Sequence, residues 1–354
     1  MIHILIEESY KNNNRTDILL QGICAVIRRK RSGIAVHAHI SEIPPDTRIV
    51  VLLCASMYWA ADVIRNLGRM GIHPLLFGFQ DIDTPYPYSC VTPAYAKAMY
   101  LLTERLLSEH AQTVAVLGYN ADSIPDQLKL MGVRHAAYEH GVDVKVFCNR
   151  GDVASCMAEF EREGGAAVNI VCVNDAIAVI LHSLYPHLIK HRYVCSCSGM
   201  KISEYIYPHW QTSTINYDEA GRSLARLYLF LEKCTVINPT TMTIDMELCP
   251  SAEDVGLPVG GHKDDQAGTD FYGDALVQEV ETVDHMLMLC DTLDIGILQD
   301  VIKGMPYERI AEKHYLAPNT VKYRISAMSK NAEVQSRKGL MVLLGRFGLF
   351  REPD

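Results

Sequence analysis

Short apolar runs alternate with longer amphipathic stretches over the first 250 residues of the chain. The apolar runs, rich in Val, Ile and Leu, predict strands at 2–7, 34–40, 48–54, 73–78, 113–119, 144–148, 167–173 and 193–198. The stretches between them predict helices at about 15–30, 57–70, 92–109, 124–140, 151–163 and 175–184. Buried strands separated by helices are typical of parallel sheets covered on both faces, and this many units fit two α/β lobes better than one sheet. We therefore expect a cleft between the lobes, beyond the carboxyl ends of the strands.

The pattern changes after residue 249. Residues 250–273 are rich in Gly, Pro and Asp, show no apolar periodicity and predict a linker. Beyond them, helical periodicity predicts helices at about 274–289, 291–303, 306–314, 318–330 and 335–347. The chain of 354 residues is thus expected to comprise a two-lobed domain at 1–249, a linker at 250–273 and a small all-α domain at 274–354.

The helices predicted at 306–314 and 318–330 are joined by a tight turn. Pro318 suits the first turn of a helix, where its missing N–H costs no hydrogen bond. Val321, Ile325 and Met328 recur at i, i+4 and i+7 and predict the buried stripe. Polar, aromatic and basic side chains can read base edges and bind phosphate. The candidate DNA-binding residues of these types are Asn319, Thr320, Lys322, Tyr323, Arg324, Ser326, Lys330 and Arg337.

This C-terminal segment resembles the LuxR-type helix-turn-helix that ends many bacterial response regulators, over about residues 290–349. The resemblance rests on Gly304 with Glu308-x-Ile310-Ala311, then Thr320-Val321-Lys322, then Val334-x-x-Arg337. The chain departs from the family at Cys290–Gly296 and has Ala332-Glu333 where a Leu-Gly pair is usual. The resemblance implies double-stranded DNA as a partner. We also expect a homodimer, because one short recognition helix provides little affinity alone.

The distribution of charge agrees with this interpretation. The formal net charge of −9 argues against a protein that coats nucleic acid over its whole surface. Between Lys313 and Arg346, however, seven Lys and Arg residues stand against one acid, Glu333. A basic segment on an acidic body is typical of a DNA-contacting module attached to a unit that does not itself bind DNA.

The first 249 residues resemble the ligand-binding domain of LacI/GalR-type repressors, which share the type I fold of periplasmic sugar-binding proteins. The segments that support the resemblance, in chain order, are Thr113–Gly118, Leu128–Gly132, Val171–Ala178 with its Asn174-Asp175-x-x-Ala178 motif, and Thr214–Asn216. The resemblance implies two lobes that close on a small-molecule effector, sugar-like or a related metabolite, with the chain crossing between them near 110, 214 and 235. LacI-type repressors have their DNA-binding unit at the N-terminus, whereas here it would follow the sensor.

Positions matched to that family suggest part of the effector site. Asn174 and Asp175 are expected at the cleft rim, and Lys129 stands where the family usually has an Arg that binds the ligand. Lys offers a point charge in place of a planar fork, so the ligand geometry should differ. Loops that follow strand ends in the first lobe add candidates whose rings stack on sugar faces or whose carboxylates and amides bind hydroxyls: Glu8, Tyr10, Asn13, Tyr58 and Gln80.

The sequence predicts neither a signal peptide nor a membrane span. The N-terminal apolar run is only six residues long and ends at Glu7-Glu8, and no stretch approaches the ~18 apolar residues that a span needs. We therefore expect a cytoplasmic protein whose eleven cysteines are reduced thiols. Cys195-Ser-Cys197 alone is weak evidence for zinc, so we expect no metal and no cofactor.

Two other classes of protein fit the sequence less well. A two-lobed α/β enzyme would be expected to show a nucleophile elbow, a phosphate loop or an H-E-x-x-H motif, and none occurs in the sequence. A phosphorylation-driven response regulator needs an Asp after its third strand, where this chain has Cys54-Ala-Ser-Met57. We therefore predict a ligand-responsive transcriptional regulator rather than an enzyme. A front domain that only dimerises stays open as an alternative.

Overall fold

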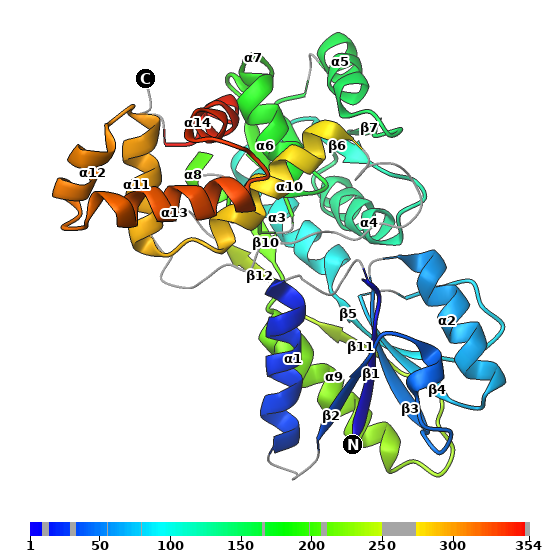
Figure 1. Cartoon of the computed structure of the whole chain (residues 1–354). Coiled ribbons are helices and arrows are strands. Elements are labelled where there is room, and N and C mark those ends of the chain that lie inside the picture. Colours follow the sequence, from blue (N-terminus) through cyan, green and yellow to red (C-terminus); the bar gives the residue numbers. More distant parts are fainter. Residues whose placement is uncertain are drawn as a thin grey trace.

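Two α/β lobes and a group of C-terminal helices make up the chain, as the computed structural model shows (Figure 1). The structure describes residues 1–8, 14–28, 33–54, 56–78, 80–164, 167–197, 199–206, 211–249 and 274–350. The predicted linker at 250–273 lies outside the described residues, as do the candidate ligand contacts Tyr10 and Asn13.

The first lobe is built on a parallel sheet with strand order β11-β5-β4-β3-β1-β2. Its strands are β1 (Ile2–Ile6), β2 (Ile34–His37), β3 (Ile49–Leu53), β4 (His73–Phe77), β5 (Ser89–Pro93) and β11 (Thr241–Ile244). A 3-10 turn, η3 (Ile40–Glu42), follows β2. One face of the sheet packs on α1 (Asn14–Ile27) and α9 (Tyr217–Glu232), and the other on α2 (Met57–Arg69). Strands covered on both faces explain the nearly continuous apolar runs in the sequence.

The second lobe has a smaller parallel sheet with strand order β7-β6-β8-β9. Its strands are β6 (Val114–Tyr119), β7 (Val144–Cys148), β8 (Asn169–Cys172) and β9 (Tyr193–Cys195). Its helices are α3 (Tyr95–Glu109), α4 (Ile124–Glu139), α5 (Val153–Glu163), α6 (Asp175–Leu184), α7 (Pro186–Ile189) and α8 (Ser203–Ile206). A short antiparallel pair, β10 (Thr212–Thr214) and β12 (Glu247–Cys249), lies beside it. The two-lobed α/β prediction is confirmed.

The chain passes between the two sheets at residues 94, 215–216 and 245–246. The crossings expected near 110 and 235 are therefore wrong. The crossing expected near 214 lies immediately before the observed one at 215–216. The first error arises because α3 belongs to the second lobe, where it packs closely along α4: a Cβ on Gly132 would lie 2.1 Å from the carbonyl oxygen of Ala96. The error near 235 arises because the predicted set lacks β11, a Thr-rich strand. After α9 the chain adds β11 to the first sheet, and only then crosses to the second lobe.

The C-terminal region, in its described part, consists of helices joined by short turns. It contains α10 (Ala275–Met288), α11 (Thr292–Ile302), α12 (Tyr307–Lys313), α13 (Pro318–Asn331) and α14 (Arg337–Arg346). Each lies within two residues of its predicted range. The predicted stripe on α13 is confirmed, since Val321, Ile325 and Met328 are all buried. None of the helices in the described part of the chain is both long and apolar enough to cross a membrane.

Helix α6 is buried on all sides because it lies between the second sheet and α10 (Figure 1). Its residues from Asp175 to Leu181 are all buried, and they share one apolar core with Val280 and Val283 of α10. A helix that is apolar all round is expected only where a second layer covers its outer face. The C-terminal helices therefore pack directly onto the second lobe.

Polar contacts fix this packing at several points. The Asp284 carboxylate of α10, which is 2% exposed, accepts a hydrogen bond from the Ile202 N–H at 2.8 Å, just before α8. Asp274, the N-cap of α10, accepts one from the Val153 N–H at 2.9 Å, at the start of α5. The Ser183 hydroxyl at the end of α6 donates to the carbonyl oxygen of Phe347 at 3.0 Å.

Candidate ligand cleft and nucleic-acid interface

Candidate residues of the first lobe lie at the carboxyl edge of its sheet. Glu8 lies two residues after the end of β1, Tyr58 lies in the first turn of α2 after β3, and Gln80 follows β4. These three strands are neighbours in the sheet, and in Figure 1 β1 runs from the N-terminus toward the second lobe. Glu8 and Tyr58 are exposed and Gln80 is half-buried, so this edge presents a carboxylate, a ring and an amide.

Three asparagines lie at the carboxyl edge of the second sheet. Asn120 follows β6, Asn149 follows β7 and Asn174 follows β8, and these strands are neighbours. Each amide oxygen accepts a local backbone N–H at 3.0 Å, which fixes the orientation of the side chain. The Nδ2 atom of Asn149 is buried and has no hydrogen-bond partner within the described part of the chain. Such a donor suits an oxygen of a bound molecule, because a buried unpaired N–H is costly.

The sequence had pointed to Asn174 and missed the other two asparagines. Asn120 and Asn149 each stand directly after a buried parallel strand, and that position was the available signal.

Asp175 does not lie at the cleft rim, so its prediction as a ligand contact is wrong. It is fully buried and accepts hydrogen bonds from Ser196 Oγ at 2.5 Å, Thr212 Oγ1 at 2.7 Å, the Met200 N–H at 2.7 Å and Ser203 Oγ at 3.1 Å. Burial raises the pKa of this carboxyl, and the four hydrogen bonds act against that rise. The carboxylate joins the start of α6 to the segment that leads to α8.

The structure also contradicts the prediction that Lys129 binds ligand from the cleft. Its side chain is only 1% exposed, its Nζ lies 3.4 Å from Oδ1 of the equally buried Asp126, and it lies 5.2 Å from the centre of the Tyr95 ring. A buried ion pair of this kind is costly to break, because either partner alone would be an uncompensated charge. Lys129 thus ties α4 to the start of α3.

Helices α12 and α13 pack against each other and leave one face of α13 uncovered. The candidate residues exposed on that face are Asn319, Thr320, Lys322, Tyr323, Ser326 and Lys330. Tyr323 is 76% exposed, which is high for a tyrosine on a helix whose other face is buried. The Lys322 Nζ lies 5.6 Å from the centre of the Tyr307 ring of α12, which holds this cation near the helix start.

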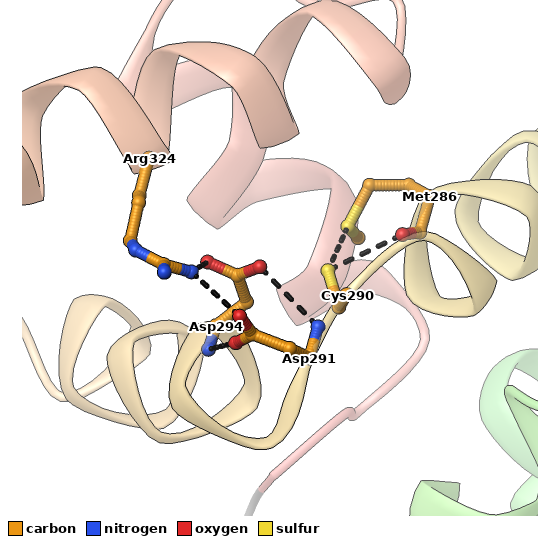
Figure 2. A network of polar contacts seen from close by, with 5 residues as sticks. All are labelled: Met286, Cys290, Asp291, Asp294 and Arg324. Atoms are coloured by element: carbon orange, nitrogen blue, oxygen red, sulfur yellow. Dashed lines mark hydrogen bonds and ion pairs between the residues drawn. The ribbon is translucent and has the colours of Figure 1, made fainter.

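Arg324 and Arg337 have partners within the helical region, so the prediction that they bind DNA needs correction. Arg324 Nη1 donates to Asp291 Oδ2 at 2.9 Å and to Asp294 Oδ1 at 2.7 Å (Figure 2). Arg337 Nη2 donates to the carbonyl oxygen of Met305, and its guanidinium lies 4.7 Å from the centre of the Tyr307 ring. Both charges are engaged in holding helices together.

A buried carboxylate joins α11 to α12. Asp300 is 1% exposed and accepts hydrogen bonds from Lys313 Nζ at 2.6 Å and from His314 Nε2 at 2.7 Å. Burial by itself would raise the pKa of Asp300, but the hydrogen bonds and charges of Lys313 and His314 outweigh it and lower the pKa below the usual value. The contacts of Asp300 with Lys313 and His314 orient the turn that precedes α13.

Comparison with known proteins finds similarity in structure alone. No protein-family model and no curated protein matches the chain. A LacI family transcriptional regulator from Enterococcus faecium with bound ribose superposes with a TM-score of 0.53 at 16% identity, over 72% of this chain and 100% of that one. CcpA of Lactococcus lactis gives a TM-score of 0.54 at 16% identity, over 74% and 100% of the two chains. The glucose-galactose binding protein GanP from Geobacillus stearothermophilus gives 0.56 at 13% identity, over 72% and 99%.

The chain shares the two-lobed fold of LacI-type sensor domains. At these identities the similarity extends to the fold alone, and about a quarter of the chain lies outside the superposed part.

Proposed function

We propose that this protein is a ligand-responsive transcriptional regulator. Residues 1–249 would form a two-lobed sensor, 250–273 a linker and 274–354 a DNA-binding domain with a LuxR-type helix-turn-helix. The observation that supports this most strongly is the division of α13 into a buried stripe and an exposed face of polar, basic and aromatic residues. A helix with that division, packed on a shorter helix through a tight turn, is suited to the major groove.

Five of the exposed side chains on α13 have a role in this proposal. Lys322 and Lys330 bind phosphates, while Asn319, Tyr323 and Ser326 contact base edges. Two copies of the chain bind two half-sites as a homodimer, in the cytoplasm where the DNA lies.

The effector is a sugar-like molecule bound between the two carboxyl sheet edges. Support comes from the amides of Asn149 and Asn174 on one edge and from Glu8, Tyr58 and Gln80 on the other. Amide and carboxylate groups bind hydroxyls, and a tyrosine ring stacks on a sugar face. Structures of the same fold contain ribose or sucrose, which supports this class of ligand.

Signal transmission would run through α10 rather than through the linker alone. Because α10 covers α6 and Asp284 binds Ile202, the helical region moves with the second lobe when the lobes close. The exposed face of α13 is uncovered in this arrangement, so closure need not unmask it. It would instead change the separation of two recognition helices in the dimer, because ligand favours the closed state by its differential affinity.

The DNA-binding half of the proposal can be tested with one lysine and a matched control. Lys322→Ala should lower the log–log dependence of DNA affinity on salt by about one, as expected for one lost phosphate contact. Lys190→Ala removes an exposed lysine from the second lobe and should leave that slope unchanged. Equal slopes for the parent and the Lys322 variant would contradict the assignment of α13.

The sensor half can be tested by thermal shift against ribose, glucose, galactose, cellobiose and sucrose. A sugar at 100 times its dissociation constant should stabilise the chain by about 2.7 kcal/mol. Asn149→Ala should abolish that shift, whereas Asn238→Ala, which removes an exposed amide before β11, should retain it. A panel without any shift would instead favour a front domain that only dimerises.

A further inference from the structure

A three-residue polar cluster joins the first helix of the α11–α14 bundle to α13 (Figure 2). Asp291 is the N-cap of α11 and accepts a hydrogen bond from the Asp294 N–H at 2.7 Å. Asp294 in turn accepts one from the Asp291 N–H at 3.3 Å, which completes a capping box. Both carboxylates also accept hydrogen bonds from the same nitrogen of Arg324. The arginine is therefore held between two anchors whose own positions are fixed by the helix start.

The electrostatics of the cluster favour the charged forms of Asp291 and Arg324. The backbone N–H of Asp294 and the guanidinium of Arg324 lower the pKa of Asp291, and the two carboxylates raise the pKa of Arg324. The negative charges lie at a helix N-terminus, where the helix dipole favours them. Arg324 would have to leave two carboxylates to neutralise a phosphate, so it is poorly suited to being a simple phosphate contact.

The position of Arg324 on α13 allows the cluster to restrict rotation of the helix about its axis. Arg324 is half-buried and lies on the flank of the helix, between the buried residues Val321 and Met328 and the exposed residues Thr320 and Ala327. Apolar contacts along the stripe hold α13 against its neighbours but tolerate small rotations about its axis. A contact on the flank in which one guanidinium nitrogen bridges two carboxylates restricts that rotation, and base recognition needs side chains held within about 10–20°.

We propose that Arg324 is a positioning residue: the carboxylates of Asp291 and Asp294 hold its guanidinium and so set the rotation of α13 and the base preference of its exposed face. This inference rests on the proposed DNA-binding function. It assigns the cluster to sequence discrimination, whereas Lys322 and Lys330 contribute to sequence-independent affinity.

The test begins with a preferred duplex selected by the parent chain from a random pool. Dissociation constants are then measured on that duplex and on a scrambled one at several salt concentrations. Arg324→Ala and the double variant Asp291→Asn with Asp294→Asn should each reduce the preference by about tenfold or more, the cost of about one misplaced base contact. The salt slope of Arg324→Ala on the scrambled duplex should match that of the parent. Lys322→Ala should do the opposite and keep the preference while the slope falls by about one.

Two results would overturn the inference. One is a slope reduced by about one in Arg324→Ala with the preference retained, which identifies a phosphate contact. The other is an unchanged preference in the double Asn variant. Asparagine keeps an oxygen that can cap α11, so this variant should fold, and a thermal melt checks that it does. A parent chain that binds no DNA would refute the proposed function instead.

Discussion

The packing of α10 on the second lobe predicts the effect of removing the Asp284 carboxylate. This carboxylate is 2% exposed and accepts the Ile202 N–H at 2.8 Å. In Asp284→Ala the buried N–H would have no partner, which costs about 1–3 kcal/mol of the free energy of unfolding. Asp284→Asn keeps an acceptor oxygen at the same place and should cost less. A loss of 1–3 kcal/mol corresponds to an increase of about 5- to 150-fold in the population of the opened state.

Hydrogen exchange followed by mass spectrometry measures this population locally. If the C-terminal helices and the second lobe open as one unit, peptides covering 199–206 and 275–288 should both exchange faster in Asp284→Ala, by similar factors. The smaller effect of Asp284→Asn serves as the internal control. Faster exchange confined to 275–288, with 199–206 as in the parent, would refute a rigid connection between α10 and the second lobe.

Three further changes test other parts of the structure. The pKa of Asp300 is lowered in the folded state, so its carboxylate stabilises the fold fully above the pKa of the unfolded carboxyl, ~3.9. This stabilisation is lost as pH falls through the folded pKa. The loss of unfolding free energy caused by Asp300→Asn, measured in urea titrations, should therefore become smaller below about pH 4. Gly132→Ala should lower the free energy of unfolding measured by urea titration by about 1–3 kcal/mol, because its Cβ would meet a backbone oxygen of α3, while Gly345→Ala, with open space around its Cβ, should not. Tyr323→Ala should reduce DNA affinity without changing the melting temperature, since its ring is 76% exposed; a lower melting temperature would count against a recognition role.

Much of the fold could be predicted from the sequence because periodicity is a local property. The long helices and the buried parallel strands were found within a few residues of their observed ends. The strands β5, β10, β11 and β12 were not predicted, because they are three to five residues long and polar residues or Pro interrupt them in place of an apolar run: Ser, Thr and Pro in β5, Ser and Thr in β10, Thr in β11 and Glu in β12. Missing β11 misplaced the third crossing, which shows how one short strand decides a topology.

Residue roles were harder to predict where they depend on distant partners. Asp175 follows a strand end, as a ligand contact should, yet its four donors come from residues 196–212 and enclose it. Arg324 stands on the correct helix, but its carboxylate partners lie about thirty residues earlier in the chain. Neither partner set follows from spacing. The exposed residues of α13 could be predicted because helix periodicity alone decides which side faces outward.

The most direct test of the central claim is the DNA affinity of the full chain with and without its sugar. Fluorescence anisotropy on the selected duplex gives both dissociation constants at one salt concentration. A regulator should show affinities that differ by about 5- to 150-fold, with Asn149→Ala binding DNA equally in both conditions. Identical affinities for a sugar that stabilises the chain would contradict coupling between the sensor and α13.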